Sequence, residues 1–268
     1  MIPKIVHYSW FSGEPFPDMV SQCMASWKRL LPDYEFVLWD RERVNEIDSV
    51  FLTEALAVRK WAFAADLVRC YAVYTYGGIW LDTDVEIINS FDAYLRKRMF
   101  IGKEGRSIFN VADSFRHMYA LTAHCFGAEA GHPFLKRCLE YYQNRHFITS
   151  TDKSLPKSLQ YDMRLLPEIM SIIAAGEFGY NGSLDTEEKI EEISEDMTIY
   201  PFYVFDLPRY HQPQEVVAIH YLLGGWVDGS SVRPAIRYFR KKDLKYYLFT
   251  WFGKLLGKRR LKLNLQSY

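Results

Sequence analysis

The segment GGIWLDTDVE, residues 77–86, constrains the fold more than any other part of this 268-residue chain. A glycine pair is typical of a helix end, because glycine readily adopts the left-handed backbone that follows the last turn. The apolar run after it indicates a strand buried on both faces. We expect this strand to continue to residue 88, which places Asp82 and Asp84 on one face and Thr83 on the other.

The flanking segments alternate between strand and helix patterns. Residues 2–10 and 34–40 are rich in β-branched and aromatic residues and predict strands, and residues 19–31 between them predict a helix. Further helices are predicted over 51–76 and 131–146, and a last strand over 215–222. The alternation predicts an α/β fold with a mainly parallel sheet, in which ligands bind at the carboxyl ends of strands. The glycine-rich and acidic residues 179–196 are expected at the surface.

Charge divides the chain into two parts. From Arg233 onward there are eleven basic residues and one acidic residue, which gives this end a net charge of +10 and leaves −10 on the rest. We therefore expect a catalytic domain over residues 1–232 and a basic tail over 233–268. Four cysteines without metal or disulfide spacing, and a first segment that lacks a leader pattern, favour a cytoplasmic protein.

Two carboxylates on one face repel each other unless a cation lies between them or one is protonated. Their hard oxygen ligands suit Mg²⁺ or Mn²⁺, and such ions commonly complete their coordination with water and substrate phosphate. Asp82 and Asp84 therefore make sense as a clamp for a metal bound to a diphosphate. The alternative is a solvated pair that caps nearby backbone amides.

Other residues could complete such a site. Asp66 and Arg69 are three positions apart in the helix before the glycine pair, so they share a face and could bind sugar hydroxyls or form a local ion pair. His220, at the end of the last strand, could be a third metal ligand or a packed core histidine. Trp226 could donate its indole N–H to a phosphate or fill the core.

Four blocks of the sequence resemble glycosyltransferase family 32, the glycosyltransferases with a DXD sugar-binding region. They are IPKIVHYSWFSG, SWKRLLPDYEFVLWD, WAFAADLVRCYAVYTYGGIWLDTDVE and AIHYLLGGW, and they cover most of residues 1–104 and 218–226. The third block is the most specific, because AADxxR precedes GGIWLDTD at a fixed distance. The family includes bacterial capsule and lipopolysaccharide transferases and yeast initiating mannosyltransferases, and it is distantly similar to the glucosylating domains of large clostridial toxins.

The resemblance implies a GT-A fold and transfer from a nucleotide-sugar with retention of anomeric configuration. It implies that Trp10 stacks on the nucleotide base and that Asp66 and Arg69 contact sugar hydroxyls. It further implies that Asp82 contacts ribose and sugar and that Asp84 binds the metal directly.

The closing block of the family, of the type HHFxxSW, is matched by His220 and Trp226. This block approaches the metal and the diphosphate in the family. The sequence departs from it because Tyr221 replaces a second histidine and Gly225 stands where a serine is usual. A hydroxyl contact to phosphate is therefore expected to be absent.

The sequence leaves the donor open between UDP-sugars, which we favour because Trp10 could stack a pyrimidine, and GDP-mannose. No candidate nucleophile stands out, so we expect the acceptor to attack on the face from which the diphosphate departs. Bound Mn²⁺ or Mg²⁺ would stabilise the negative charge that develops on the leaving phosphate.

The basic tail predicts a membrane contact. Lysines lie between large apolar residues that recur at helical spacing. These apolar residues are Leu244, Tyr247, Leu248, Trp251, Phe252, Leu255 and Leu256. Such a helix lies in a membrane interface or packs on the domain. We expect residues 238–263 to contact anionic lipid on the cytoplasmic membrane, a lipid-linked glycan as acceptor, and no nucleic acid.

Two other classes of protein share part of this pattern. A DxD phosphatase also ends an apolar strand in paired aspartates, but Glu86 stands where those enzymes have threonine or valine, and the AADxxR helix would be unexplained. A sugar-binding module without catalysis would keep Trp10, Asp66 and Arg69 but would not need the metal-binding pair of Asp82 and Asp84.

Overall fold

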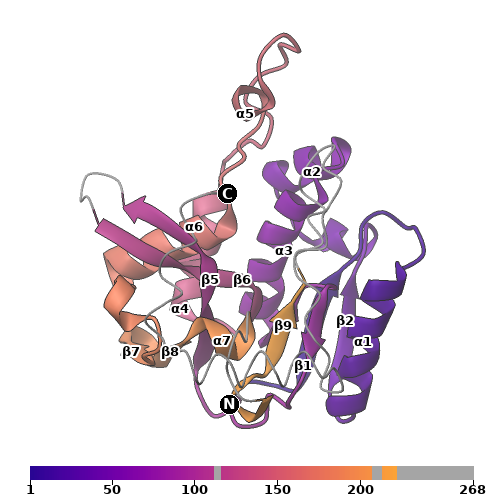
Figure 1. Cartoon of the computed structure of the whole chain (residues 1–268). Coiled ribbons are helices and arrows are strands. Elements are labelled where there is room, and N and C mark those ends of the chain that lie inside the picture. Colours follow the sequence, from indigo (N-terminus) through magenta and orange to yellow (C-terminus); the bar gives the residue numbers. More distant parts are fainter. Residues whose placement is uncertain (112–115, 207–212, 222–268) are drawn as a thin grey trace, which may run out of the picture.

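A computed structural model describes residues 1–111, 116–206 and 213–221, and these form the α/β fold that the sequence predicts (Figure 1). Within this part of the chain, seven strands form one sheet in the order β2-β1-β3-β6-β5-β8-β7. The strands are β1 (Ile5–Ser9), β2 (Glu35–Trp39), β3 (Gly78–Leu81), β5 (Met99–Val111), β6 (Arg116–Ala128), β7 (Glu191–Ile193) and β8 (Met197–Tyr200).

Most of this sheet runs in one direction. β1 is parallel to β2 and β3, and β5 is parallel to β8. β6 is antiparallel to both β3 and β5, so β3 and β5 point the same way, and β7 is antiparallel to β8. The mostly parallel sheet is thereby confirmed, with β6 and β7 as the reversed strands. A separate pair, β4 (Val85–Ile87) and β9 (Ala218–His220), is antiparallel.

Helices cover the sheet and enclose two apolar cores. The helices are α1 (Asp18–Leu30), α2 (Val50–Ala57), α3 (Trp61–Tyr76), α4 (Pro133–Tyr142), α5 (Lys157–Gln160), α6 (Leu166–Ile173) and α7 (Phe202–Phe205). One core holds side chains of α2, α3, α4 and α6, and the other holds side chains of α1, β4, α7 and β9. Figure 1 shows α5 standing away from the body of the molecule. Among the described residues, no helix combines the length and the apolar character that crossing a bilayer requires.

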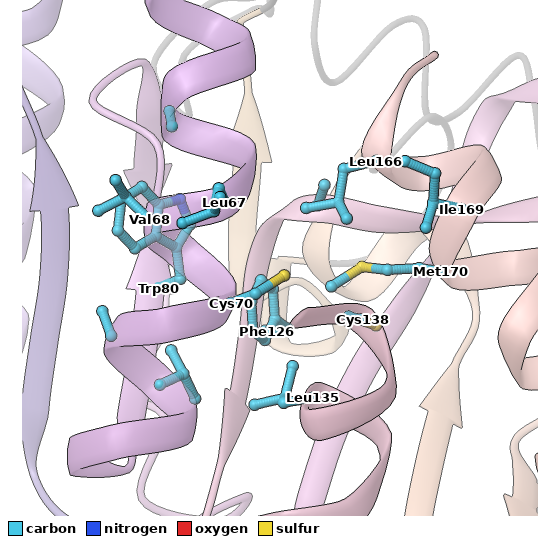
Figure 2. Close-up of a cluster of buried hydrophobic side chains, with 14 of the residues drawn as sticks. Leu67, Val68, Cys70, Trp80, Phe126, Leu135, Cys138, Leu166, Ile169 and Met170 are labelled. Carbon is cyan, nitrogen blue, oxygen red and sulfur yellow. The ribbon is translucent and has the colours of Figure 1, made fainter. Parts of the chain in front are cut away.

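The strand before the paired aspartates lies between the two cores. Ile79 and Leu81 pack into the core that contains α1, while Trp80 packs into the core that contains α3. All three are fully buried, which confirms the predicted central strand. Figure 2 shows Trp80 beside the α3 residues Leu67 and Val68, with side chains of α4 and α6 across the same core.

The glycine pair has the conformation that the sequence predicts. Gly77 follows the last residue of α3 with a φ of 67°, and its N–H donates to the carbonyl of Val73. Gly78 has a φ of 103°, and a Cβ there would lie 2.6 Å from the carbonyl oxygen of Ile5. The turn is held by buried His7, whose Nε2 donates to the Gly77 carbonyl over 2.9 Å. Nδ1 of His7 accepts from the Trp39 indole, and burial lowers the pKa of His7 to about 4.

Three predicted elements differ from the structure. The strand predicted to continue to residue 88 ends at Leu81, and a turn precedes β4 in the second sheet. The helix predicted over 51–76 is divided into α2 and α3 near Arg59, which has a φ of 59°. The last strand is shorter than predicted and pairs with β4 outside the main sheet. The break at Arg59 is a local helix end, because the N–H of Lys60 donates to the carbonyl of Ala55, whereas the pairing of β4 with β9 joins distant parts of the chain.

The sequence did not predict the long pair β5 and β6 or the strands β7 and β8. Residues 179–196 are mostly exposed, as expected, but they also enclose the fully buried Lys103. Nζ of Lys103 donates to the carbonyls of Thr186 and Lys189 and lies 2.8 Å from Glu191 Oε1. Burial lowers the pKa of this amine, which the Glu191 carboxylate opposes.

Candidate active site

The two aspartates lie in a tight turn at the carboxyl end of β3. The N–H of Asp82 donates to the carbonyl of His124 on β6, and the N–H of Val85 donates to the carbonyl of Asp82. The carbonyl of Asp84 accepts from the N–H of Tyr221 just after β9. The two carboxylates are therefore brought together by a turn fixed to β6 and β9, and not by strand alternation as predicted.

Arg69 lies at the centre of the buried part of the site. Its guanidinium is 3.2 Å from the Asp66 carboxylate and 3.2 Å from that of Asp82, and it donates to the carbonyl of Ala123. Burial alone would lower the pKa of Arg69, but the carboxylates of Asp82 and Asp66 raise it. Arg69 and Asp66 on α3 thus lie beside the turn that carries Asp82, as expected from the glycine pair between helix and strand.

Asp66 is buried and differs in environment from an ordinary surface acid. Burial raises its pKa to about 6, although the neighbouring Arg69 opposes this shift. One carboxylate oxygen accepts the N–H of Leu166, the first residue of α6, over 3.4 Å. Asp66 consequently links the site to the start of α6.

The two acids of the turn have different surroundings. Asp82 Oδ1 accepts the indole N–H of Trp80 over 2.7 Å, and the Arg69 guanidinium lies 5.4 Å from the Trp80 ring centre. Oδ1 of Asp84 instead lies 3.4 Å from Nε2 of His220. Asp82 is thus oriented by Arg69 and Trp80, and Asp84 lies beside the histidine.

A metal ion could be held where these side chains meet. Among the described residues, Asp82, Asp84 and His220 each offer one ligand atom, and these atoms lie within 4.8 Å of one another. Burial lowers the pKa of His220, but Asp84, Asp206 and Asp82 outweigh it and raise the pKa to about 9. A divalent cation would replace this proton as the positive charge among the carboxylates, so the residues fit such an ion.

Sequence reasoning missed two residues beside His220. The ring of His124 stacks on that of His220 with centroids 3.9 Å apart, and burial lowers its pKa well below the ordinary value. Asp206, which follows α7, is buried with its Oδ1 4.0 Å from Nδ1 of His220 and 3.8 Å from Nε2 of His124. No local motif marks either residue, because β6 and α7 meet β9 only in the folded chain.

Trp10 lies directly after β1, beside the turn in the sheet. β1 and β3 are parallel neighbours with His7 opposite Trp80, so their carboxyl ends lie at the same edge. The Trp10 indole donates to the carbonyl of Glu14, and its ring centre is 5.0 Å from that of Phe16. Trp226, the boundary at residue 232 and the tail from 233 lie outside the described residues.

Comparison with known families gives one match. Residues 17–101 match the model described as a glycosyltransferase sugar-binding region containing the DXD motif. This region runs from α1 into β5 and includes Asp66, Arg69, Asp82 and Asp84.

Curated relatives are similar over about half of the chain. Inositol phosphoceramide mannosyltransferase 3 of Schizosaccharomyces pombe is 32% identical over 138 residues, which are 50% of this chain and 35% of the relative. Inositol phosphoceramide mannosyltransferase 1 of the same yeast is 28% identical over 160 residues, which are 54% of this chain and 45% of the relative. The chain therefore spans less than half the length of either protein.

A solved structure of galactosyltransferase LgtC, in complex with donor and acceptor sugar analogs, is similar over 94% of this chain and 95% of its own. The identity is 11% and the TM-score 0.43. At this TM-score the likeness is too weak to place any residue of the chain.

Proposed function

Because residues 17–101 match the model of glycosyltransferases with a DXD sugar-binding region, we propose that the chain is a retaining, metal-dependent glycosyltransferase. It would transfer a hexose from a nucleotide-sugar to a glycan acceptor. The observation that carries the proposal is the convergence of Asp82, Asp84 and His220 beside the buried Arg69. These residues come from three separate parts of the chain, so a solvated pair of acids does not account for their arrangement.

The metal would be held by Asp84 and His220, with Asp82 shared between metal and donor. A divalent cation bound there would act as a Lewis acid for the departing nucleoside diphosphate. The side chain of Asp82 is 26% exposed and that of Asp84 15% exposed, so both remain open to a ligand. Carboxylate oxygens favour Mn²⁺ or Mg²⁺ at such a site.

Arg69 and Asp66 would orient the donor sugar. The guanidinium is held by two carboxylates and a backbone carbonyl, so its geometry is set before substrate binds. Preorganised donors of this kind stabilise developing charge without the cost of reorienting. The contact between Arg69 and Asp82 would also fix the position of the sugar-binding side chains relative to the metal ligands.

The donor is open between a UDP-sugar, which the sequence favoured through Trp10, and GDP-mannose. Trp10 lies at the same sheet edge as the aspartates, which supports a base-stacking role. The names of the yeast relatives, both mannosyltransferases, support GDP-mannose. A hydrolysis screen across UDP-sugars and GDP-mannose with Mn²⁺ decides between them.

A lipid acceptor at a membrane surface is part of the proposal. The relatives are named for inositol phosphoceramide, a lipid, and the basic tail has the composition of an interfacial helix. The protein would act at the cytoplasmic face of a membrane, in capsule, lipopolysaccharide or glycolipid synthesis. Deleting residues from 238 onward should release it from anionic vesicles and leave donor hydrolysis intact; unchanged vesicle binding would count against this part.

The central test compares wild type with Asp84→Ala. Mn²⁺ titrations in the presence of UDP or GDP should show coupled binding of metal and nucleotide in the wild type and its loss in the variant. Donor hydrolysis should fall by roughly 100-fold or more, the scale for removing a group that stabilises transition-state charge. Glu86→Gln, two positions away and still able to accept the Tyr221 hydroxyl, is the matched control. Wild-type activity in Asp84→Ala would contradict the metal site.

A further inference from the structure

His220 has one ring nitrogen toward the aspartates and the other toward the protein interior. Nε2 lies 3.4 Å from Asp84 Oδ1, on the side of the proposed metal ligands. Nδ1 is buried and has no hydrogen-bond partner, with Asp206 Oδ1 4.0 Å away. A buried polar atom without a partner costs about 1–3 kcal/mol, so this nitrogen calls for an explanation.

Metal ligation by Nε2 provides the explanation. A neutral imidazole that gives its Nε2 lone pair to a cation carries its proton on Nδ1. That N–H then needs an acceptor, and metal-bound histidines usually donate it to a carboxylate or a carbonyl. Asp206 Oδ1 is such an acceptor, because it lies 4.0 Å from Nδ1, slightly beyond hydrogen-bond distance.

The stacked ring of His124 limits how the ring of His220 can move. The ring of His124 stacks on that of His220 with an interplanar angle of 28°, which limits tilting out of the ring plane. The backbone N–H of His220 donates to the carbonyl of Asp206, so the two residues are fixed at close range. Stacking does not prevent a shift of the ring within its own plane, and a shift that shortens the 4.0 Å between Nδ1 and Asp206 Oδ1 would form the hydrogen bond.

We propose that Asp206 is a positioning residue, whose carboxylate accepts the Nδ1 proton of His220 and thereby aims Nε2 at the metal. The inference rests on the proposed metal site and adds a residue that contacts neither metal nor donor. Asp206 fixes the tautomer of His220, and His124 fixes the plane of its ring.

The same three residues could be suspected of forming a second cation site, since His124, Asp206 and His220 also offer ligand atoms within 4.8 Å. The geometry disfavours it. Nε2 of His124 donates its proton to the carbonyl of Phe205 over 3.0 Å and is not available as a ligand. Two stacked rings also direct their nitrogen lone pairs in nearly parallel planes, which prevents them from converging on one ion.

Asp206→Asn tests the proposal in the full chain. The amide is isosteric with the carboxylate, but it lacks the negative charge that favours the Nδ1 proton. We expect Mn²⁺ affinity, measured by electron paramagnetic resonance with UDP or GDP present, to fall 10- to 100-fold, the usual cost of losing a metal ligand's hydrogen-bond partner. Asp33→Asn, which removes an exposed acid paired with Lys4, should bind Mn²⁺ as wild type does.

Nitrogen NMR of the Mg²⁺-loaded wild type provides an independent measurement. With ¹⁵N-labelled histidine, the His220 signal should show a protonated Nδ1 and an unprotonated, metal-bound Nε2. A proton on Nε2 in the loaded protein would overturn the proposal even if Asp206→Asn failed to fold.

Wild-type affinity in Asp206→Asn, together with lost binding in Asp84→Ala, would refute the role of Asp206 alone. Unchanged binding in Asp84→Ala would instead refute the metal site itself.

Discussion

Arg69→Met removes the buried cation that lies between the carboxylates of Asp66 and Asp82. Asp66 and Asp82 would then lie close together without the guanidinium between them. Breaking a buried ion pair on one side costs about 3–5 kcal/mol, because the remaining charge stays desolvated. Asp82 is partly exposed, and Asp66 can take up a proton since its pKa would rise above the value of about 6 that it has beside Arg69. Both effects reduce the penalty, so we expect a loss near 3 kcal/mol at neutral pH.

Urea unfolding and thermal melting measure this change. For a domain of this size, a loss near 3 kcal/mol corresponds to a lower melting temperature by roughly 6–12 °C. Arg98→Met is the matched control, because Arg98 forms its ion pairs with Glu129 and Glu195 at the surface, where such pairs contribute at most about 1 kcal/mol. If Arg69→Met were no less stable than Arg98→Met, the guanidinium would not hold the site together.

A double variant separates charge from packing. Asp66→Asn should be less harmful, or stabilising, in the Arg69→Met background than in wild type, because it removes the acid that the arginine compensates. Additive losses from the two substitutions would show that their side chains do not interact and would contradict the reasoning.

Three further predictions concern the structure around the site. Gly78→Ala should lower the free energy of unfolding by roughly 2 kcal/mol or more, because φ is positive and the new Cβ would meet a backbone carbonyl, whereas Gly176→Ala, with open space, should be neutral or slightly stabilising in thermal melts. The pKa of buried His7, about 4, lies below its value in the unfolded chain. The stability that neutral His7 contributes is therefore complete above pH 6.5 and is lost as the pH falls toward 4. Urea unfolding of His7→Gln should lack roughly 3 kcal/mol of this pH dependence. Lys103→Met should lower the free energy of unfolding by roughly 3 kcal/mol, because it leaves the Glu191 carboxylate without its buried partner. Backbone hydrogen exchange over residues 184–191 should become faster. Unchanged exchange there would mean that the Lys103 amine does not hold this segment.

Local sequence patterns sufficed for the elements that precede the aspartates. The apolar residues after the glycine pair gave the central strand, and the glycines gave the helix end, because both depend on backbone preferences and burial that adjacent residues express. The spacing of Asp66 and Arg69 placed them on one helix face, and their proximity to Asp82 followed from the tight turn at Gly77.

Long-range pairing decided what the patterns could not. After Leu81 the chain turns, with the N–H of Val85 bonded to the carbonyl of Asp82, and distant residues hold this turn: Asp82 bonds to His124 on β6 and Asp84 to Tyr221 just after β9. Residues as far apart as His124, Asp206 and His220 carry no shared local signal, since their meeting depends on how β6, α7 and β9 pack.

The sequence by itself thus determined the α/β class, because this depends on the kinds of residues and their local order, and it predicted the family and the candidate acids of the site. The tertiary structure decided which groups surround each acid. Asp82 is held by Arg69 and Trp80, while Asp84 lies beside a histidine that two further residues surround. The physical reason is that the charge and orientation of a side chain depend on the groups around it in space, which only the folded chain brings together.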